Sequence, residues 1–376
     1  MLKIFLTGDN HIGLKYASHS EAATICAGRI AAFASMVDAA NAEGCELFVV
    51  AGDLFENTGS IAKKDVKAVL ELLSRFDGIV AILPGNHDYY DPNAKLWQYF
   101  RELMQPYDNI MLLCEPKPYA VSLGDNDAVL YPAPCRALHS APGENALGWI
   151  KAADIPRDGV CRIGIAHGAV EGETIDSEGA YYLMRRDELE SIPVDLWLLG
   201  HTHVPFPRGL SEKETVTDER IFNAGTHVQT DVACRSDGEC FILSIDGDRT
   251  VRAKKLVSGG LRFFRRTVTV YPGELSSRLE EALRDMEDGS VVDVLLRGTV
   301  SAEEYESRHA LAEEALSRFL EGTYDDAGLS RQITQELIEA EFPETSLSAR
   351  LLSALSEEPK ELQLAYELLT SLRGDK

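Results

Sequence analysis

The most constraining feature of this sequence is a polar cluster that directly follows an apolar run within Ile79–Tyr90. The stretch reads IVAILPGNHDYY. Its first five residues have the composition of a buried β-strand, and the Pro-Gly pair marks a turn at the end of that strand. Asn86, His87 and Asp88 come next, so an amide, an imidazole and a carboxylate are delivered together. Because open parallel sheets bind ligands beyond the carboxyl ends of their strands, we expect a functional site here.

The same arrangement recurs after four other apolar runs, which end in GDNH, GD, AHG and GHTH. Five of the nine histidines lie at these strand ends, which scattered core or surface histidines would not do. Asp9 and His11 are two residues apart, so in extended backbone their side chains would leave on the same side. The polar residues at the five strand ends are Asp9, His11, Asp53, Asn86, His87, His167, His201 and His203.

The chemistry of these side chains indicates a centre of two metal ions. They offer oxygen and nitrogen donors without a thiolate, and one carboxylate could bridge the ions. Such donors suit manganese, iron or zinc, so the donor set does not choose the metal.

The segments between the strand ends indicate a mostly parallel sheet. Helical spacing of apolar residues is expected at Arg29–Glu43 and Ile61–Phe76, between the strands Leu2–Thr7, Glu46–Ala51 and Ile79–Leu83. Strands that alternate with helices are typical of crossover units in α/β folds.

Composition limits the class of protein. The 376 residues suffice for two domains, and 45% hydrophobic with 26% charged residues is ordinary for a globular chain. No apolar run approaches the roughly 20 residues of a membrane helix, and the first residues do not resemble a signal peptide. The seven cysteines form no CxxC pair. We therefore expect reduced thiols, a cytoplasmic location and no membrane partner.

The net charge of −24 argues against a chain that coats nucleic acid through a general positive field. A polyanionic substrate would need metal ions or a local basic patch. The stretch Val251–Arg266 contains six basic and no acidic residues, and the alternative is the exposed face of a pair of connecting strands. The candidate DNA contacts are Arg252, Lys254, Lys255, Arg262, Arg265 and Arg266.

Taken together, the strand-end sequences resemble the motif set of the calcineurin-like metallophosphoesterase superfamily. The set also includes GDLFE at Gly52–Glu56 and GNHD at Gly85–Asp88. GDLFE and the late turn at 224–226 are most similar to the DNA-repair nucleases of the SbcD and meiotic recombination eleven type. The resemblance covers roughly the first 245 residues. It implies an α/β fold: a four-layer αββα sandwich with two mixed sheets and the metals at one edge.

Carried over residue by residue, the resemblance gives one metal the ligands Asp9, His11 and His203. It gives the other metal Asn86, His167 and His201, and Asp53 bridges the two.

The resemblance also implies that His87 is catalytic: it would stabilise or protonate the leaving oxygen without binding metal. Asp88 is expected to orient an imidazole. Two positions depart from the family pattern: Glu56 stands where many relatives have His or Asp, and Thr226 where the nucleases have serine.

Three regions are expected. A metallophosphoesterase (nuclease) domain would span 1–258, and a small α+β capping domain would span 261–335, where Ser301 and Glu304 form a capping box that opens a helix. C-terminal helices in 336–376 would either dock a partner or pack back on their own domain.

The predicted function is a phosphodiesterase that uses two divalent metal ions, with manganese expected first and iron or zinc as alternatives. It would act as a DNA exonuclease or endonuclease at DNA ends in repair. The expected partners are DNA ends, an SbcC-like coiled-coil ATPase and a second copy of the chain. One alternative is a phosphodiesterase or phosphatase for small or cyclic phosphates. Another is a non-catalytic scaffold that binds metal.

Overall fold

The computed structural model describes residues 1–124, 126–172, 180–234 and 236–374. The chain divides into two compact units, Met1–Arg262 and Phe263–Lys376. The expected boundary at 258–261 lies close to this division.

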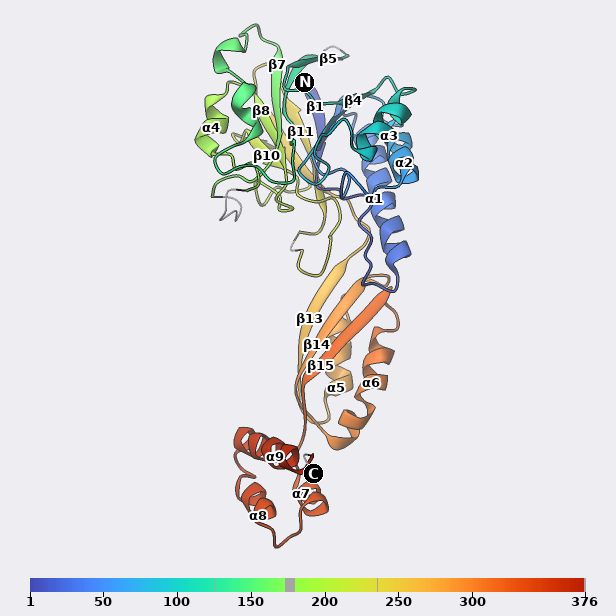
Figure 1. The fold of residues 1–376 in the computed structure, drawn as a ribbon, viewed down its shortest axis with the longest axis vertical. Coiled ribbons are helices and arrows are strands. Elements are labelled where there is room, and N and C mark those ends of the chain that lie inside the picture. The colour runs from blue at the N-terminus through green and yellow to red at the C-terminus, as the bar shows by residue number, and fades with distance from the viewer. Residues whose placement is uncertain (125, 173–179, 235, 375–376) are drawn as a thin grey trace. The chain divides into compact units, whose positions relative to one another are not determined.

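The first unit contains a seven-stranded sheet with the order β4-β3-β2-β1-β11-β12-β9. Three of these strands, β1, β4 and β11, are labelled in Figure 1. Four strands of this sheet are parallel: β1 (Leu2–Thr7), β2 (Leu47–Ala51), β3 (Ile79–Leu83) and β4 (Ile110–Leu112). Three continue it in antiparallel pairings: β11 (Glu239–Ile245), β12 (Val251–Val257) and β9 (Thr215–Thr217). Because β1, β2 and β3 are parallel, their carboxyl ends lie at one edge of the sheet.

The second sheet of this unit has the order β10-β8-β7-β6-β5. The parallel strands are β6 (Asn126–Ala133), β7 (Cys161–His167), β8 (Leu196–Gly200) and β10 (Ile221–Asn223). The edge strand β5 (Tyr119–Leu123) is antiparallel to β6. Both sheets are therefore mixed, as predicted.

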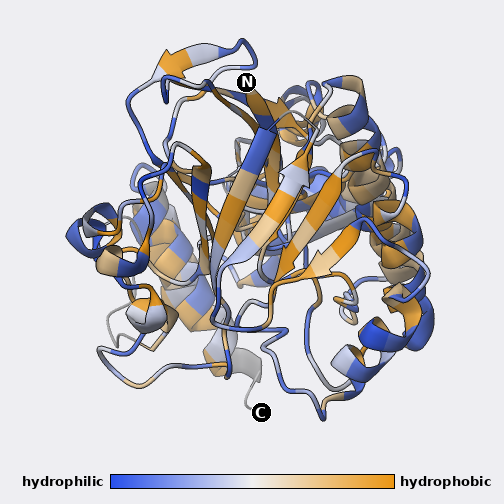
Figure 2. Ribbon diagram, turned by 90° about the horizontal axis from the view of Figure 1, so that it is seen from above, coloured by the Kyte–Doolittle hydropathy of each residue, from blue (hydrophilic) through white to orange (hydrophobic). Residues whose placement is uncertain are grey.

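Three apolar cores hold these layers together. The inner core joins the facing sides of the two sheets and includes Leu6, Val49 and Leu198. A second core joins the larger sheet to α1 (Ala22–Ala42), α2 (Lys63–Leu73) and α3 (Lys95–Met104). A third core joins the smaller sheet to α4 (Arg186–Ser191) and to the short 3-10 helix η1 (Ala146–Trp149). Another short 3-10 helix, η2 (Ala152–Asp154), follows η1 in the chain. Figure 2 shows apolar residues concentrated on the strands between the flanking helices. The predicted αββα sandwich is confirmed.

Helix α1 differs from expectation in two ways. It begins at Ala22, seven residues before the predicted start, because the alanine-rich segment before Arg29 favours helix. It is also long and apolar enough to cross a membrane by length and composition, so the expectation that no such segment exists was wrong. A core helix passes the same test, and α1 buries Ile25, Phe33 and Val37 within the first unit.

The second unit begins with three parallel strands in the order β13-β14-β15. They are β13 (Phe263–Val270), β14 (Val291–Val300) and β15 (Glu321–Arg331). The helices α5 (Leu275–Leu283) and α6 (Ala302–Leu316) share an apolar core with this sheet. The capping box of α6 is confirmed: the Glu304 N–H donates to Ser301 Oγ at 3.2 Å, and the Ser301 N–H donates to Glu304 Oε2 at 2.9 Å. Strand β15 was missed because EGTYDDAGLSR contains few apolar residues.

Three helices end the chain: α7 (Gln335–Glu341), α8 (Leu347–Ala354) and α9 (Pro359–Gly374). They bury a small cluster of their own that includes Ile338, Phe342 and Leu352. They lie in the segment where C-terminal helices were predicted, and α7 begins one residue before it. The last two residues of the predicted segment 336–376 lie outside the described residues.

Candidate metal centre

The structure brings all seven predicted ligands to the carboxyl ends of strands in the first unit. Asp9 and His11 follow β1, Asp53 follows β2, and Asn86 follows β3. His167 ends β7, and His201 and His203 follow β8. The two histidines after β8 are half-exposed and the other five ligands are buried. The centre is therefore open on the side of the β8 loop.

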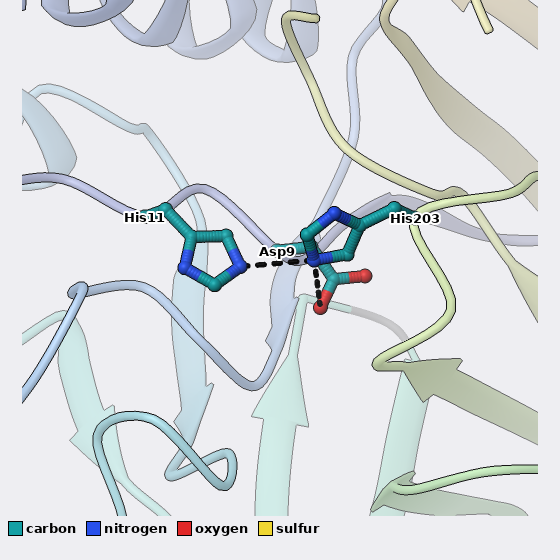
Figure 3. A group of neighbouring side chains, drawn as sticks. All are labelled: Asp9, His11 and His203. Carbon is teal, nitrogen blue, oxygen red and sulfur yellow. Dashed lines mark hydrogen bonds and ion pairs between the residues drawn. The ribbon is translucent and has the colours of Figure 1, made fainter. Parts of the chain in front are cut away.

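The first predicted ligand set is assembled. His11 Nε2 and His203 Nε2 are 3.0 Å apart, and His203 Nε2 lies 4.0 Å from Asp9 Oδ1 (Figure 3). Three ligand atoms from two strand ends therefore meet around one point.

The second predicted set converges on Asn86. Its Oδ1 lies 3.0 Å from His167 Nε2 and 3.1 Å from His201 Nδ1. The Asn86 amide nitrogen donates to the Leu138 carbonyl at 3.3 Å, so its oxygen faces the two imidazoles. This orientation is the one that a metal ligand requires.

Asp53 lies between the two sets. Its Oδ2 is 3.2 Å from His167 Nε2 and 3.8 Å from His11 Nε2. Its Oδ1 accepts the His87 backbone N–H at 2.8 Å. One buried carboxylate thus reaches a ligand of each set, as a bridging role requires.

The donor spacing fits divalent metal ions. Metal–nitrogen and metal–oxygen bonds of about 2.1 Å put neighbouring ligands of an octahedral site about 3 Å apart. The donor pairs around Asn86 and the His11–His203 pair are separated by 3.0, 3.1 and 3.0 Å. Oxygen and imidazole donors suit several first-row metals and do not choose among them.

Hydrogen bonds fix which nitrogen of two imidazoles faces the centre. His11 Nδ1 lies 2.9 Å from Glu56 Oε2, and His167 Nδ1 lies 2.8 Å from the Ala51 carbonyl. Both partners are acceptors, so each Nδ1 carries a proton and each Nε2 is the nitrogen that can bind a metal ion. Glu56 is therefore part of the site. The sequence marked its position as a departure from the family but gave no role for it.

The expectation for Asp88 differs from the structure. Its carboxylate accepts backbone N–H groups of Gly85 at 2.7 Å and Phe55 at 3.0 Å, and no imidazole is among its described hydrogen-bond partners. Burial, and then the charge of Asp53, raise its pKa to about 7. The side chain is turned toward main-chain donors, so it joins the GNHD loop to the GDLFE loop. The carboxylate that orients an imidazole is that of Glu56.

The ligands occupy unusual backbone conformations. Eight described non-glycine residues have a positive φ, and five of them are predicted ligands: Asp9 (49°), His11 (47°), Asp53 (51°), His201 (105°) and His203 (53°). The extended backbone assumed for the first two was therefore wrong. Such conformations cost about 1–3 kcal/mol each and persist where the surroundings impose them. Here the Asp9 N–H donates to the Gly52 carbonyl at 3.1 Å, and the His201 N–H donates to Asp9 Oδ1 at 2.9 Å.

Two glycines leave room for the ligands. Gly52 has a φ of 92°, and a Cβ there would lie 2.1 Å from His167 Nδ1. A Cβ on Gly85 would lie 2.2 Å from Asp53 Oδ1. Any side chain at either position would displace a ligand.

His87 lies at the open side of the centre. Its side chain is 39% exposed, and its ring packs edge-on against His11 with ring centroids 4.8 Å apart. Its Nδ1 lies 3.2 Å from the Glu56 carbonyl, so Nδ1 donates there and Nε2 remains available to a substrate. His11, Asp53 and His87 also form a group that could hold an ion. Metal content of a His87 variant distinguishes these roles.

In the absence of metal, Asp53 carries a negative charge and His167 a positive charge. Burial raises the Asp53 pKa, but the charge and hydrogen bond of His167 outweigh this and hold it well below its usual range. Burial lowers the His167 pKa, but Asp53 raises it further, to about 9. Burial, and then the charge of His11, lower the His203 pKa to about 3. A metal ion would have to displace the proton on His167, and its charge would then take the place of that proton beside Asp53.

Arg29 supports the first ligand loop and was not predicted. It is 2% exposed. Its Nη2 donates to the Asn10 carbonyl at 2.6 Å, and its Nη1 donates to the Gln229 carbonyl at 3.2 Å and to Tyr16 Oη at 3.0 Å. This guanidinium joins the loop of Asp9 and His11 to the late turn of the chain. A lone cation within an apolar helix was the signal available in the sequence.

Two aromatic rings adjoin the second ligand set. The Tyr181 ring lies 5.1 Å from the His201 ring at an interplanar angle of 32°. The exposed His139 ring lies 5.1 Å from Tyr181. Sequence analysis did not identify either residue, because both come from irregular segments without a strand-end pattern.

The predicted basic patch differs from expectation, because acidic residues, most of them distant in sequence, pair with most of its cations. Arg252 pairs with Asp246, and Arg266 lies over the Phe264 ring. The other ion pairs are Lys254–Glu43 (2.8 Å), Lys255–Glu239 (3.3 Å), Arg262–Asp237 (3.0 Å) and Arg265–Asp293 (2.7 Å). Five of the six cations thus have a carboxylate partner. The stretch is also divided between the two units.

Comparison with known proteins identifies the family. Residues 2–205 match the family described as calcineurin-like phosphoesterase. The fold is similar to TT1561 of Thermus thermophilus, at 14% identity, 67% coverage of this chain, 97% of that chain and a TM-score of 0.42. It is also similar to the purple acid phosphatase PPD1 of yellow lupin (Lupinus luteus) seeds, at 12% identity and a TM-score of 0.38. That match covers 68% of this chain and 51% of the phosphatase chain. Comparison with curated proteins gives no match. The family match and the assembled ligand set place this chain in the calcineurin-like phosphoesterase family, whose members hydrolyse phosphoesters with divalent metals.

Proposed function

We propose that this protein is a two-metal phosphodiesterase that cleaves DNA near its ends, as its resemblance to the SbcD-type nucleases implies. The observation that supports DNA most is the Tyr181–His139 pair beside the ligand His201. Aromatic rings hold nucleobases by stacking, at about 1–3 kcal/mol per base. A nucleotide bound at the metals would have such a surface within reach.

The side chains of the site have different roles in the proposed hydrolysis. When bound, two divalent ions supply Lewis-acid stabilisation of the phosphate and lower the pKa of a coordinated water. Glu56 and the Ala51 carbonyl hold the lone pairs of His11 and His167 toward the centre. His87, with its Nδ1 proton held by the Glu56 carbonyl, directs Nε2 at the substrate. When both ring nitrogens are protonated, His87 can give its Nε2 proton to the leaving oxygen.

Charge supports an assembly with a partner. The chain has a net charge of −24, and the cations of Val251–Arg266 are largely paired with acids. DNA binding by the isolated chain should therefore be weak. Leucines on α8 and α9 are exposed, with Leu347 at 83% and Leu372 at 71%. We propose that these helices dock an SbcC-like coiled-coil ATPase that supplies the remaining DNA-binding surface.

The test is a substrate comparison with the purified protein and Mn²⁺. Duplex DNA with free ends, closed circular DNA, single-stranded DNA, a cyclic nucleotide and bis(p-nitrophenyl) phosphate should be compared at equal enzyme concentration. We expect cleavage of DNA with free ends, with closed circular duplex cleaved least. His87→Ala serves as the inactive control. Turnover of the cyclic nucleotide with no cleavage of any DNA would favour the small-phosphate enzyme, an alternative that the net charge supports.

A further inference from the structure

A carboxylate lies at the exposed edge of the metal centre. The Glu56 side chain is 26% exposed, and its Oε2 lies 2.9 Å from His11 Nδ1. Its Oε1 lies 3.9 Å from Nδ1 of His87, which is itself 39% exposed. Glu56 thus adjoins the imidazole that faces the substrate.

The charge of this carboxylate remains in the site when its two imidazole partners are neutral. Among the described residues, its ion pairs are with His11 and His87 alone. A His11 that binds metal through Nε2 is neutral and donates only its Nδ1 proton. When His11 binds metal and His87 is neutral, the site therefore keeps a negative charge beside the position of the leaving group.

We propose that Glu56 selects phosphodiesters over phosphomonoesters, an inference that rests on the proposed phosphodiesterase function. A phosphodiester carries one negative charge, whereas a monoester carries nearly two at pH 7 because its second pKa is about 6. The additional anionic oxygen of the monoester takes the place that the second ester group holds in a diester. A fixed charge at about 6 Å disfavours it about tenfold at an effective dielectric of about 40, between the values for a protein surface and for bulk water.

The test is Glu56→Gln, which removes the charge and keeps an oxygen that accepts the His11 Nδ1 proton. Bis(p-nitrophenyl) phosphate and p-nitrophenyl phosphate share one leaving group, so the ratio of their kcat/KM values reports charge selection. The diester preference should fall about tenfold in the variant, mainly through a lower KM for the monoester. The matched control is Glu71→Gln, which removes an exposed carboxylate on α2 that pairs with Lys67 at 3.5 Å. It should leave the ratio unchanged.

Two calorimetric titrations give readouts besides turnover. Mn²⁺ should bind the metal-free Glu56→Gln protein within a few-fold of wild type, because the His11 hydrogen bond is kept. Inorganic phosphate should bind the variant about tenfold more tightly than wild type at saturating Mn²⁺. The phosphate titration does not depend on which substrate the enzyme hydrolyses.

The outcomes separate this inference from the proposed function. If the wild-type protein cleaves no diester but phosphate binds the Glu56→Gln variant more tightly, the phosphodiesterase proposal is wrong. The repulsion of phosphate by Glu56 is then still supported. An unchanged substrate ratio together with unchanged phosphate affinity would overturn the selection by Glu56, even if diester cleavage is robust.

Discussion

Replacing Asp53 with Asn tests the two-metal centre most directly, because one carboxylate oxygen lies 3.2 Å from His167 Nε2 and 3.8 Å from His11 Nε2. Asparagine keeps an oxygen for the His87 backbone N–H but removes the charge. Loss of groups that merely orient ligands weakens metal binding by about 10–100-fold. A directly bound bridging charge should therefore be worth at least about 100-fold, or about 2.8 kcal/mol, for each ion. Calorimetric titration with Mn²⁺ and metal content after gel filtration measure this loss.

The matched control for that substitution is Asp88→Asn. Asp88 is equally buried, but its described hydrogen bonds go to backbone N–H groups. Each of its oxygens accepts one backbone N–H, so asparagine keeps one of these two hydrogen bonds while removing the charge. We expect the control to keep both metals and the Asp53 variant to lose both metals and turnover together. An Asp53→Asn protein with two bound ions and full phosphodiester turnover would refute the bridging assignment.

The geometry leads to three further predictions. His87→Ala should keep the wild-type metal content while turnover falls by roughly 10²–10⁴, and loss of metal would instead make His87 a ligand. In metal-free protein, the His167 pKa is raised from 6.5 to about 9. Protonated His167 therefore stabilises the folded state by about 3 kcal/mol below pH 6.5, and this stabilisation is lost as the pH rises through 9. Urea unfolding of wild type and His167→Asn at pH 6 and pH 10 should show this difference, and parallel pH profiles would contradict it. Neutralising the six cations of Val251–Arg266 should reduce the slope of log K against log salt concentration for duplex DNA by well under about 0.9 per residue, because five of them are already paired with carboxylates. A reduction of the full amount, about 0.9 per residue, would instead show that these cations contact phosphates.

The positions of the ligands were predictable because strand composition and order are local features of the sequence. Parallel β1, β2 and β3 end at one edge, so Asp9, Asp53 and Asn86 had to approach one another once crossover helices were recognised. The second sheet repeats this with β7 and β8. The same reasoning could not reveal the partners of isolated cations. Lys254 meets Glu43, which directly follows α1 more than two hundred residues earlier, and no local pattern encodes that contact.

Backbone strain at the ligands explains why their exact geometry could not be predicted from the sequence either. Alternation along an extended strand predicted that Asp9 and His11 would share a side, yet both have a φ near 50°. These conformations are unfavourable locally, so only long-range contacts can impose them. The Asp9 N–H donates to Gly52 and the His11 N–H to the Asp53 carbonyl at 2.9 Å, which ties the first ligand loop to the second. Arg29 adds a third tie from α1 at the Asn10 carbonyl. The centre is therefore held in place by contacts between loops, and substitutions at Gly52, which would displace His167, or at Arg29 should disturb metal binding although neither residue is a ligand.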